Sequence, residues 1–209
     1  MAARDTDQTQ FWRGDFGNNY TVRNSENARN LNSQIELWKT ILESLSGDPP
    51  QSILEVGANT GNNLRAIGSL SKAELFALEP NKIARQMLAK TGTVPLQNVL
   101  NGVATSIDLA NESIDLAFTS GVLIHIHPNN LKQSCQEIYR VAARFIICIE
   151  YFSDTPEEVT YRGHNEKLFK RDFGEYWLDL FPEMKTLKYG FIWKRLSGLD
   201  NLTWWVFQK

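Results

Sequence analysis

Residues 53–62 read Ile-Leu-Glu-Val-Gly-Ala-Asn-Thr-Gly-Asn, and the fold prediction starts from this stretch. The apolar run Ile53–Val56 predicts a buried strand, Gly57 ends it, and Gly61 and Asn62 lead into a helix. A strand that turns into a helix in this way is typical of sheets that bind ligands beyond the carboxyl ends of their strands. A glycine at the turn allows the backbone to approach such a ligand closely, because it has no Cβ.

Strands and helices alternate on both sides of this stretch. Apolar residues at helical spacing predict a helix over Leu31–Leu45, which Pro49 and Pro50 end. Further strands are expected at 75–78, within 96–104, at 113–119 and at 145–149, with helices between them. Such alternation indicates parallel βαβ units and an open, doubly wound α/β sheet.

The last third of the chain has a different pattern. Phe169–Leu180 predicts an amphipathic helix that ends before Pro182. The runs Leu187–Trp193 and Leu202–Phe207 predict two strands with no helix between them, and therefore an antiparallel hairpin. In the second run, strand alternation predicts that Trp204 and Trp205 point to opposite sides, one into the core and one to the surface.

Composition excludes several classes of protein. The chain has 209 residues, a length that suits one domain, and its 22 Lys and Arg against 24 Asp and Glu argue against a nucleic-acid binder. No apolar run is long enough to span a membrane, and the polar N-terminus lacks the apolar core of a secretory signal. With only two cysteines, we expect a cytoplasmic protein without disulfides, and the absence of metal-ligand spacing predicts no metal site. We also expect no membrane partner, and a monomer or homodimer.

The acidic residues around the glycine turn indicate the kind of ligand. Glu79 lies 22 residues after Gly57, at the end of the next expected strand, where a carboxylate accepts the hydroxyl hydrogens of a ribose. The spacing Glu55-x-Gly57-x-Asn59-x-Gly61 departs from the G-x-G-x-x-G of dinucleotide sites. A glutamate in the strand disfavours a pyrophosphate and favours a cation, so the charges favour S-adenosylmethionine over NAD. The alternative is that the glycines only permit a tight turn.

With these residues the sequence resembles the class I S-adenosylmethionine-dependent methyltransferases. Residues 55–61 look like their first motif, Glu79 like their ribose-binding acid, and residues 113–121 like their fourth strand and the loop beyond it. The resemblance covers residues 30–209 and implies a Rossmann-like sheet of seven strands with an antiparallel C-terminal hairpin. We expect S-adenosylmethionine, and its product S-adenosylhomocysteine, to contact Tyr20, Arg23, Glu55, Gly57, Asn59, Gly61, Asn62, Glu79, Pro80, Asn81, Ala104, Thr105, Ser120 and Gly121.

One position departs from that family's pattern. Many class I methyltransferases place an aspartate after the third strand to bind the adenine amino group. This sequence has Gly102–Ser106 near that place and Asp108 slightly later. Adenine recognition is therefore expected from backbone groups, from Thr105 or Ser106, or from a shifted Asp108.

A narrower resemblance covers nearly the whole chain. It rests on Phe11-Trp-x-Gly-x-Phe-Gly-x-x-Tyr20-x-x-Arg-Asn24, Gly121-Val-Leu-Ile-His-Ile-x-Pro128, Tyr161-Arg-Gly-His164, Leu168-Phe-Lys-Arg-Asp-Phe173 and Thr203-Trp-Trp205. These motifs are similar to those of the methylases associated with pseudaminic acid biosynthesis, which are small bacterial enzymes generally found with surface-polysaccharide genes. The resemblance implies a role in polysaccharide synthesis.

Two histidines are candidates for a general base. A neutral hydroxyl acceptor needs a base for methyl transfer, whereas an anionic oxygen does not. His125 follows the fourth strand, where donor and acceptor should meet, and is the first candidate; His164 is the second. The alternative for His125 is a structural role, either capping the next helix or bonding backbone, and His127 is expected to be structural or exposed.

A basic cluster indicates the acceptor. Residues 160–171 hold four Lys and Arg and one acid, and Arg162 is suited to bidentate binding of a phosphate or carboxylate. The expected acceptor is a small anionic carbohydrate-type molecule, a nucleotide-linked or phosphorylated sugar, methylated on oxygen. The alternatives are N-methylation of an amino sugar or small amine, and a binding module without catalysis; solvated charges are the alternative for the cluster itself. The expected acceptor contacts are Tyr161, Arg162, His164, Lys170 and Arg171.

Residues 1–29 precede the expected domain of residues 30–209. Their glycines and aromatic side chains suggest a flexible lid over the site rather than packing alone. From this segment, Tyr20 and Arg23 are expected to reach the cofactor or the acceptor.

Overall fold

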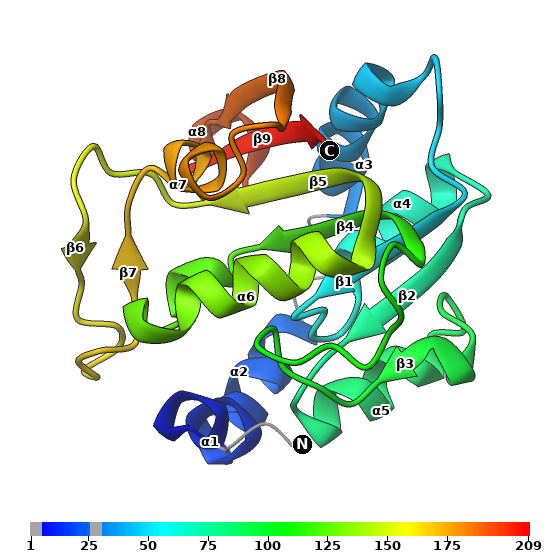
Figure 1. Cartoon of the computed structure of the whole chain (residues 1–209). Helices are drawn as coiled ribbons and strands as arrows, with labels where there is room; N and C mark the ends of the chain where they lie inside the picture. The colour runs from blue at the N-terminus through cyan, green and yellow to red at the C-terminus, as the bar shows by residue number, and fades with distance from the viewer. Residues whose placement is uncertain (1–5, 26–30) are drawn as a thin grey trace.

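The computed structural model describes residues 6–25 and 31–209, and its centre is a seven-stranded sheet (Figure 1). The strand order is β3-β2-β1-β4-β5-β9-β8, and β9 alone is antiparallel to its neighbours. This confirms the predicted doubly wound sheet with one reversed strand. The strands are β1 Ser52–Val56, β2 Glu74–Leu78, β3 Val99–Leu100, β4 Ile114–Ser120, β5 Ala142–Glu150, β8 Lys185–Ile192 and β9 Leu202–Gln208.

Helices cover both faces of the sheet (Figure 1). The helices α3 Leu31–Leu42, α4 Asn62–Leu70 and α5 Lys82–Lys90 pack on one face, and α6 Pro128–Val141 and α7 Phe173–Leu180 pack on the other. Trp204 lies in the core under α3, α4 and α5 and is 5% exposed, whereas Trp205 lies in the core under α6 and α7 and is 8% exposed. The prediction that one of the two lies at the surface is therefore wrong, because this strand has covered faces on both sides.

The segment before α7 differs from the prediction. The helix begins at Phe173 rather than Phe169, because the side chain of Asp172 caps it by accepting from Glu175 N at 2.9 Å. Phe169 lies instead in β7 Phe169–Lys170, which pairs with β6 Glu157–Glu158 in a separate two-stranded antiparallel sheet. A four-residue helix, α8 Lys194–Ser197, also lies between β8 and β9, where no helix was expected.

The expected lid is helical. It consists of α1 Asp7–Arg13 and α2 Asp15–Ser25, and the expected boundary at residues 29 and 30 lies outside the described residues. Asn81 Nδ2 donates to Trp12 O at 3.0 Å and to Asn18 Oδ1 at 2.9 Å, so these helices are held next to the end of β2. Gln8 is buried and joins α1 to two other segments, accepting from His127 N at 2.8 Å and donating to Glu166 O at 3.2 Å.

The described residues also include the short 3-10 helices η2 Glu43–Leu45, η3 Leu96–Asn98 and η4 Leu123–His125. The two cysteines, Cys135 and Cys148, are free and buried. Within residues 6–25 and 31–209, no helix is both long and apolar enough to cross a membrane.

Candidate active site

A cavity of about 920 Å³ lies beyond the carboxyl ends of the parallel strands. It is where a doubly wound sheet places its ligands. Most of the residues singled out from the sequence line it: Tyr20, Glu55, Gly57, Asn59, Asn62, Glu79, Pro80, Asn81, Ala104, Thr105, Ser120, Gly121, His125, Tyr161 and Arg162. Five others, Arg23, Gly61, His164, Lys170 and Arg171, are not among its lining residues.

The buried carboxylate of Glu79 is oriented by backbone amides. Its Oε2 accepts from Asn59 N at 2.8 Å and its Oε1 accepts from Asn81 N at 2.7 Å. Each carboxylate oxygen has capacity for a further hydrogen bond, so the two oxygens are placed to accept from a pair of neighbouring hydroxyls. The turn that brings Asn59 here needs Gly57 at φ +77°, where an added Cβ would lie 2.6 Å from Val122 Cγ2.

Glu55 lines the same cavity and has one carboxyl oxygen without a partner among the described residues. Asn63 Nδ2 donates to Glu55 Oε1 at 2.7 Å, whereas Glu55 Oε2 is buried with no hydrogen-bond partner among the described residues. Burial raises the pKa of this carboxyl to about 8, and the charge of Glu79 adds to the rise. In its ionised form this buried oxygen needs a donor, and a cationic donor satisfies it best.

The loop after β3 and the helix α6 form another wall. Ala104 and Thr105 line the cavity, together with Asn130 and Gln133 of α6, whereas Ser106 and Asp108 do not line it. Gln133 Nε2 donates to Thr105 O at 2.9 Å and so fixes the loop against α6. Of the groups weighed for adenine recognition, backbone groups and Thr105 therefore lie at this wall, and Asp108 is exposed away from it.

Comparison with known families gives one match at this part of the fold. Residues 54–144, from β1 to β5, match the family model described as a methyltransferase domain. The similarity to that family covers these residues, which are less than half of the chain. No curated protein matches the sequence significantly.

Solved structures similar to this methyltransferase confirm its fold. The 1,6-didemethyltoxoflavin-N1-methyltransferase of Burkholderia thailandensis, solved with 1,6-didemethyltoxoflavin and S-adenosylhomocysteine, has a TM-score of 0.73 at 15% identity over 100% of this chain and 93% of that chain. A SAM-dependent methyltransferase of Leishmania major has a TM-score of 0.75 at 16% identity over 97% and 87%. A possible histamine N-methyltransferase of Thermotoga maritima has a TM-score of 0.61 at 17% identity over 91% and 98%. The architecture is that of class I methyltransferases.

S-adenosylmethionine is the cofactor that fits the residues present. The unpartnered Oε2 of Glu55 suits its ammonium group, and the carboxylate of Glu79 suits the two hydroxyls of its ribose. When bound, the cofactor supplies a methyl group on a positively charged sulfur. The residues of the methyltransferase contribute position and charge around that group.

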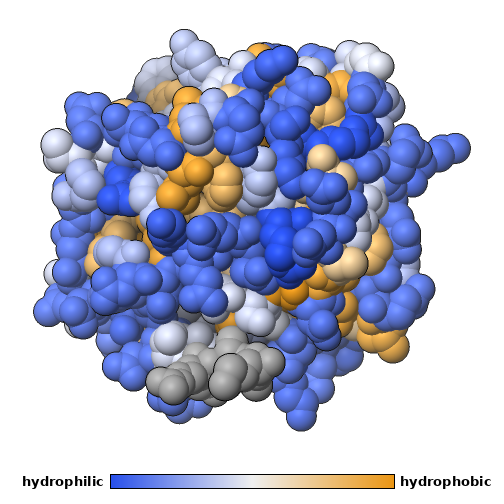
Figure 2. Space-filling view, viewed as in Figure 1, coloured by the Kyte–Doolittle hydropathy of each residue, from blue (hydrophilic) through white to orange (hydrophobic). Residues whose placement is uncertain are grey.

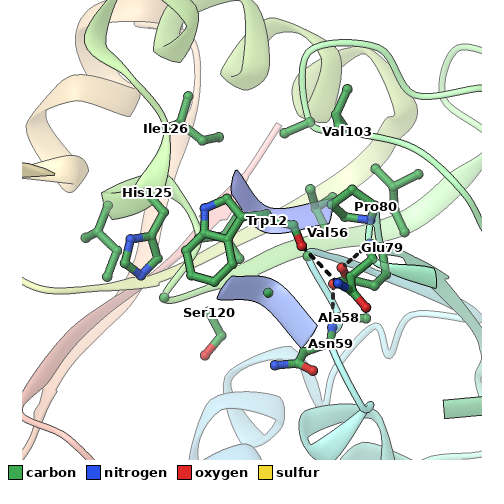
Figure 3. Close-up of a pocket in the computed structure, with 18 of the residues that line it drawn as sticks. Trp12, Val56, Ala58, Asn59, Glu79, Pro80, Val103, Ser120, His125 and Ile126 are labelled. Carbon is green, nitrogen blue, oxygen red and sulfur yellow. Dashed lines mark hydrogen bonds between the residues drawn. The ribbon is translucent and has the colours of Figure 1, made fainter. Parts of the chain in front are cut away.

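His125 has one ring nitrogen held by backbone and one available. Its Nδ1 lies 2.6 Å from Lys167 O, and since a carbonyl oxygen only accepts, the ring proton is on Nδ1 and Nε2 is unprotonated. Burial lowers the pKa of His125 to about 4, so the ring is neutral at physiological pH. Figure 3 shows the Trp12 ring next to His125, and the ring centroids of Trp12 and Tyr161 each lie 4.8 Å from that of His125. The backbone bond that the alternative, structural role of His125 predicted is present, and it leaves Nε2 able to accept a proton.

Glu150 holds the loop that carries His125. This fully buried carboxylate at the end of β5 accepts from Val122 N at 3.1 Å, from Leu123 N at 3.0 Å and from Ile124 N at 3.4 Å. Burial raises the pKa of Glu150 to about 7, and the amide donors act in the opposite direction. The position of η4, and with it the position of His125, depends on this carboxylate.

Aromatic side chains from α1, from α2 and from the segment before β7 pack together, and three of them, Trp12, Tyr20 and Tyr161, line the cavity. This aromatic cluster consists of Phe11, Trp12, Phe16, Tyr20, Tyr161 and His164. Three cationic groups lie over its rings: Arg23 at 6.0 Å from Phe16, Lys167 at 5.4 Å from Phe11 and Arg162 at 5.7 Å from Tyr161. We call these three the basic rim; in the described ranges none of them forms a salt bridge. His164 is exposed and packs on Phe11 and Phe16 rather than lining the cavity.

Lys170 and Arg171 lie apart from the site. Lys170 Nζ is 3.4 Å from Glu157 Oε1, and the guanidinium of Arg171 lies 4.4 Å from the centre of the Tyr176 ring. Both line a second cavity of about 250 Å³ beside β7 and the start of α6. The basic cluster of the sequence is therefore divided, with Arg162 and Lys167 on the side of the main cavity.

Several lining residues were not singled out from the sequence. Asn63, which bonds Glu55, lies in the first turn of α4 directly after Asn62, and that turn was the available signal. Tyr151 follows β5 immediately, so the rule that selected Ser120 after β4 also applied to it. Asp200, which accepts from Tyr151 Oη at 3.1 Å, gave no signal because it lies in the β8–β9 connection.

Proposed function

We propose that this methyltransferase uses S-adenosylmethionine to methylate a hydroxyl oxygen of a small anionic carbohydrate-type acceptor, a nucleotide-linked or phosphorylated sugar of surface-polysaccharide synthesis. The observation that carries the proposal is the unprotonated Nε2 of His125 in a cavity that is also lined by Arg162 of the basic rim. A base and an anion-binding border are what a hydroxyl acceptor with a phosphate requires.

The acceptor site lies between the lid and the segment before β7. The aromatic cluster offers ring faces and edges against which a sugar or a nucleobase packs, with Trp12 and Tyr161 lining the cavity. Arg162 lines the same wall, so its guanidinium is placed for bidentate contact with a phosphate. Arg23 and Lys167 extend the positive charge toward the solvent.

Each residue of the site then has a role in the transfer. Glu55, with Asn63, and Glu79, with the amides of Asn59 and Asn81, orient the cofactor. The basic rim orients the acceptor. His125 accepts the hydroxyl proton on Nε2 while Lys167 O fixes its ring, and Glu150 fixes the loop.

Acceptor binding is tested by comparing two arginine variants. We expect Arg162→Ala to raise the KM for the sugar phosphate or nucleotide sugar that is turned over by about tenfold or more, with a smaller change in kcat, because a charge-assisted contact is lost. Arg171→Ala is the matched control, because Arg171 lies at the second cavity. Equal KM values for Arg162→Ala and the parent enzyme would contradict the anionic acceptor.

A second candidate is N-methylation of a small amine. It is favoured by Asp200 and Tyr151 on the cavity wall, since a carboxylate and a phenol hydrogen-bond an amine, and by the neutral ring of His125. Screening both sugar phosphates and small amines as acceptors distinguishes the two. Turnover of amines alone, with Asp200→Asn raising KM and Arg162→Ala leaving it unchanged, would replace the first proposal by the second.

A further inference from the structure

The edge strand β8 exposes a continuous set of apolar side chains. Tyr189 is 72% exposed, Phe191 62%, Trp193 52% and Leu196, in α8, 81%. Tyr189 pairs with Trp205 of β9, so it lies on the face of the sheet that α7 covers. The cover reaches Trp205, where Trp177 and Gly174 of α7 pack, and ends there. Tyr189 and, by strand alternation, Phe191 therefore lie on an uncovered continuation of this core face, and the exposed Trp193 and Leu196 follow them in the chain.

Apolar side chains exposed to this extent are expected to be covered by a binding partner. Folded proteins rarely leave several large aromatic side chains together in water, and an open edge strand of this kind favours aggregation unless it is occupied. Figure 2 shows a mostly hydrophilic face with apolar atoms in several places, one of them in the region of α7 and α8. We call the exposed Leu187, Tyr189, Phe191, Trp193 and Leu196 the β8–α8 patch.

Charge around the patch indicates the kind of partner. Residues 184–199 contain Lys185, Lys188, Lys194 and Arg195 but no acidic residue. Lys194 pairs with Asp200 and Lys188 donates to Thr40 O, whereas Lys185 and Arg195 form no ion pair in the described ranges. A second copy of the chain would bring these like charges together across a two-fold axis. An anionic surface would meet them with opposite charge.

We propose that the β8–α8 patch binds the surface of a lipid bilayer that contains anionic lipids. Trp193 and Tyr189 suit the headgroup region, because their rings are apolar with one polar end, and Phe191 and Leu196 suit the acyl boundary. Lys185 and Arg195 lie beside them in the chain to meet headgroup phosphates. The sequence expectation of no membrane partner rests on the absence of a spanning segment. The β8–α8 patch would bind the surface of a bilayer without crossing it.

Binding in this way would place the active-site cavity close to the lipid. β8 runs parallel to β1 and β4, so its carboxyl end lies at the edge of the sheet where the cavity opens. Asp200, in the connection from α8 to β9, and Leu202, the first residue of β9, line that cavity. A docked enzyme would therefore present its acceptor entrance beside the headgroups.

The test is co-sedimentation with vesicles, without cofactor or acceptor, so its result is independent of the methylation proposal. We expect the full chain to bind vesicles of phosphatidylcholine with phosphatidylglycerol, to bind phosphatidylcholine alone more weakly, and to dissociate as salt rises. The double variant Phe191→Ser with Trp193→Ser should bind the anionic vesicles at least about tenfold more weakly. Each substitution removes an apolar side chain from the contact with the lipid. Arg195→Glu should weaken binding to the anionic vesicles only.

Leu96→Ser is the matched control. Leu96 is 74% exposed in η3, beside β3 at the opposite edge of the sheet, and its variant should bind as the parent does. The melting temperatures of all variants show that the fold is retained. Failure of the parent to bind anionic vesicles would overturn the proposal. A dimer in light scattering that the double variant abolishes, without vesicle binding, would assign the patch to a second copy instead.

Discussion

Asn63 Nδ2 donates to one carboxyl oxygen of Glu55 at 2.7 Å and leaves the other oxygen buried and without a partner among the described residues. The two side chains come from α4 and β1, on either side of the glycine turn. Burial raises the pKa of Glu55 to about 8, so this carboxyl carries a proton at neutral pH until a cation binds. The carboxyl of Glu55 can therefore lose its proton and pair with a positively charged ligand that binds in the site.

Binding of S-adenosylhomocysteine, which retains the ammonium group, should therefore release a proton from Glu55. We expect release of up to about one proton at pH 7, because the ammonium favours the ionised carboxylate. Titration calorimetry in buffers of different ionisation enthalpy measures it. Glu55→Gln should bind without proton release and more weakly, and Glu183→Gln, an exposed carboxyl outside the cavity, should behave as the parent. Equal proton release from the parent and Glu55→Gln would contradict this role.

Glu55 also predicts how stability depends on pH. Its folded pKa of about 8 lies above the ordinary glutamate pKa of 4.5, which applies to the unfolded chain. Its contribution to stability is therefore full below pH 4.5 and is lost as pH rises toward 8. Without ligand, the melting temperature of Glu55→Gln should fall less than that of the parent between pH 4.5 and 8. An equal fall in both proteins would contradict the raised pKa of Glu55.

His125 should act as a base whose own titration lies below the physiological range. Its pKa of about 4 predicts a kcat that does not change with His125 ionisation at neutral pH and falls only as pH approaches 4. His125→Gln should lower kcat by roughly 10²- to 10⁴-fold with little change in cofactor affinity. The control is His127→Gln, because Nδ1 of His127 caps α6 by accepting from Asn129 N at 3.2 Å. Full activity of His125→Gln would show that the acceptor needs no base from this residue.

The same lowered pKa gives His125 a measurable effect on folding. The neutral ring is favoured in the folded protein, so protonation of the unfolded chain opposes folding between pH 6.5 and about 4. Stability from this group is present above that window and is lost as pH falls through it. His125→Gln should therefore lose less stability on acidification than the parent, measured by denaturant titration at each pH.

The sheet and the cofactor side of the site follow from local sequence, and the acceptor side does not. Strand, glycine turn and helix are adjacent in the chain around Gly57, so their chemistry is visible in a few residues. Lys170 and Arg171 belong to the same basic cluster of the sequence as Arg162. The pairing of β7 with β6 nevertheless places them at the second cavity. The contact of His125 with Lys167 joins residues 42 apart, and only folding brings them together.

The carboxylate of Glu150 should be required for the position of the His125 loop. In Glu150→Gln the side-chain NH2 cannot accept, so at least one of the amides of Val122, Leu123 and Ile124 loses its partner at a cost of about 1–3 kcal/mol. We expect lower kcat at unchanged affinity for S-adenosylhomocysteine. Glu137→Gln provides the comparison, because Glu137 accepts from Ile107 N at 2.9 Å outside the cavity. It should lose stability but keep kcat.

Asn81 should couple the lid to the cofactor site. Its Oδ1 caps α5 by accepting from Ala84 N at 2.9 Å, while its Nδ2 holds Trp12 O and Asn18 Oδ1. Asn81→Ala should therefore cost about 1 kcal/mol for the lost cap and also release the lid, seen as faster hydrogen exchange in α1 and α2. Asp172→Ala removes the cap of α7 in the same way but touches no lid residue, so it should lower stability without changing exchange in α1 and α2. Equal exchange in the two variants would mean that α1 and α2 are held in place by the aromatic cluster and Gln8 alone, because those contacts do not involve Asn81.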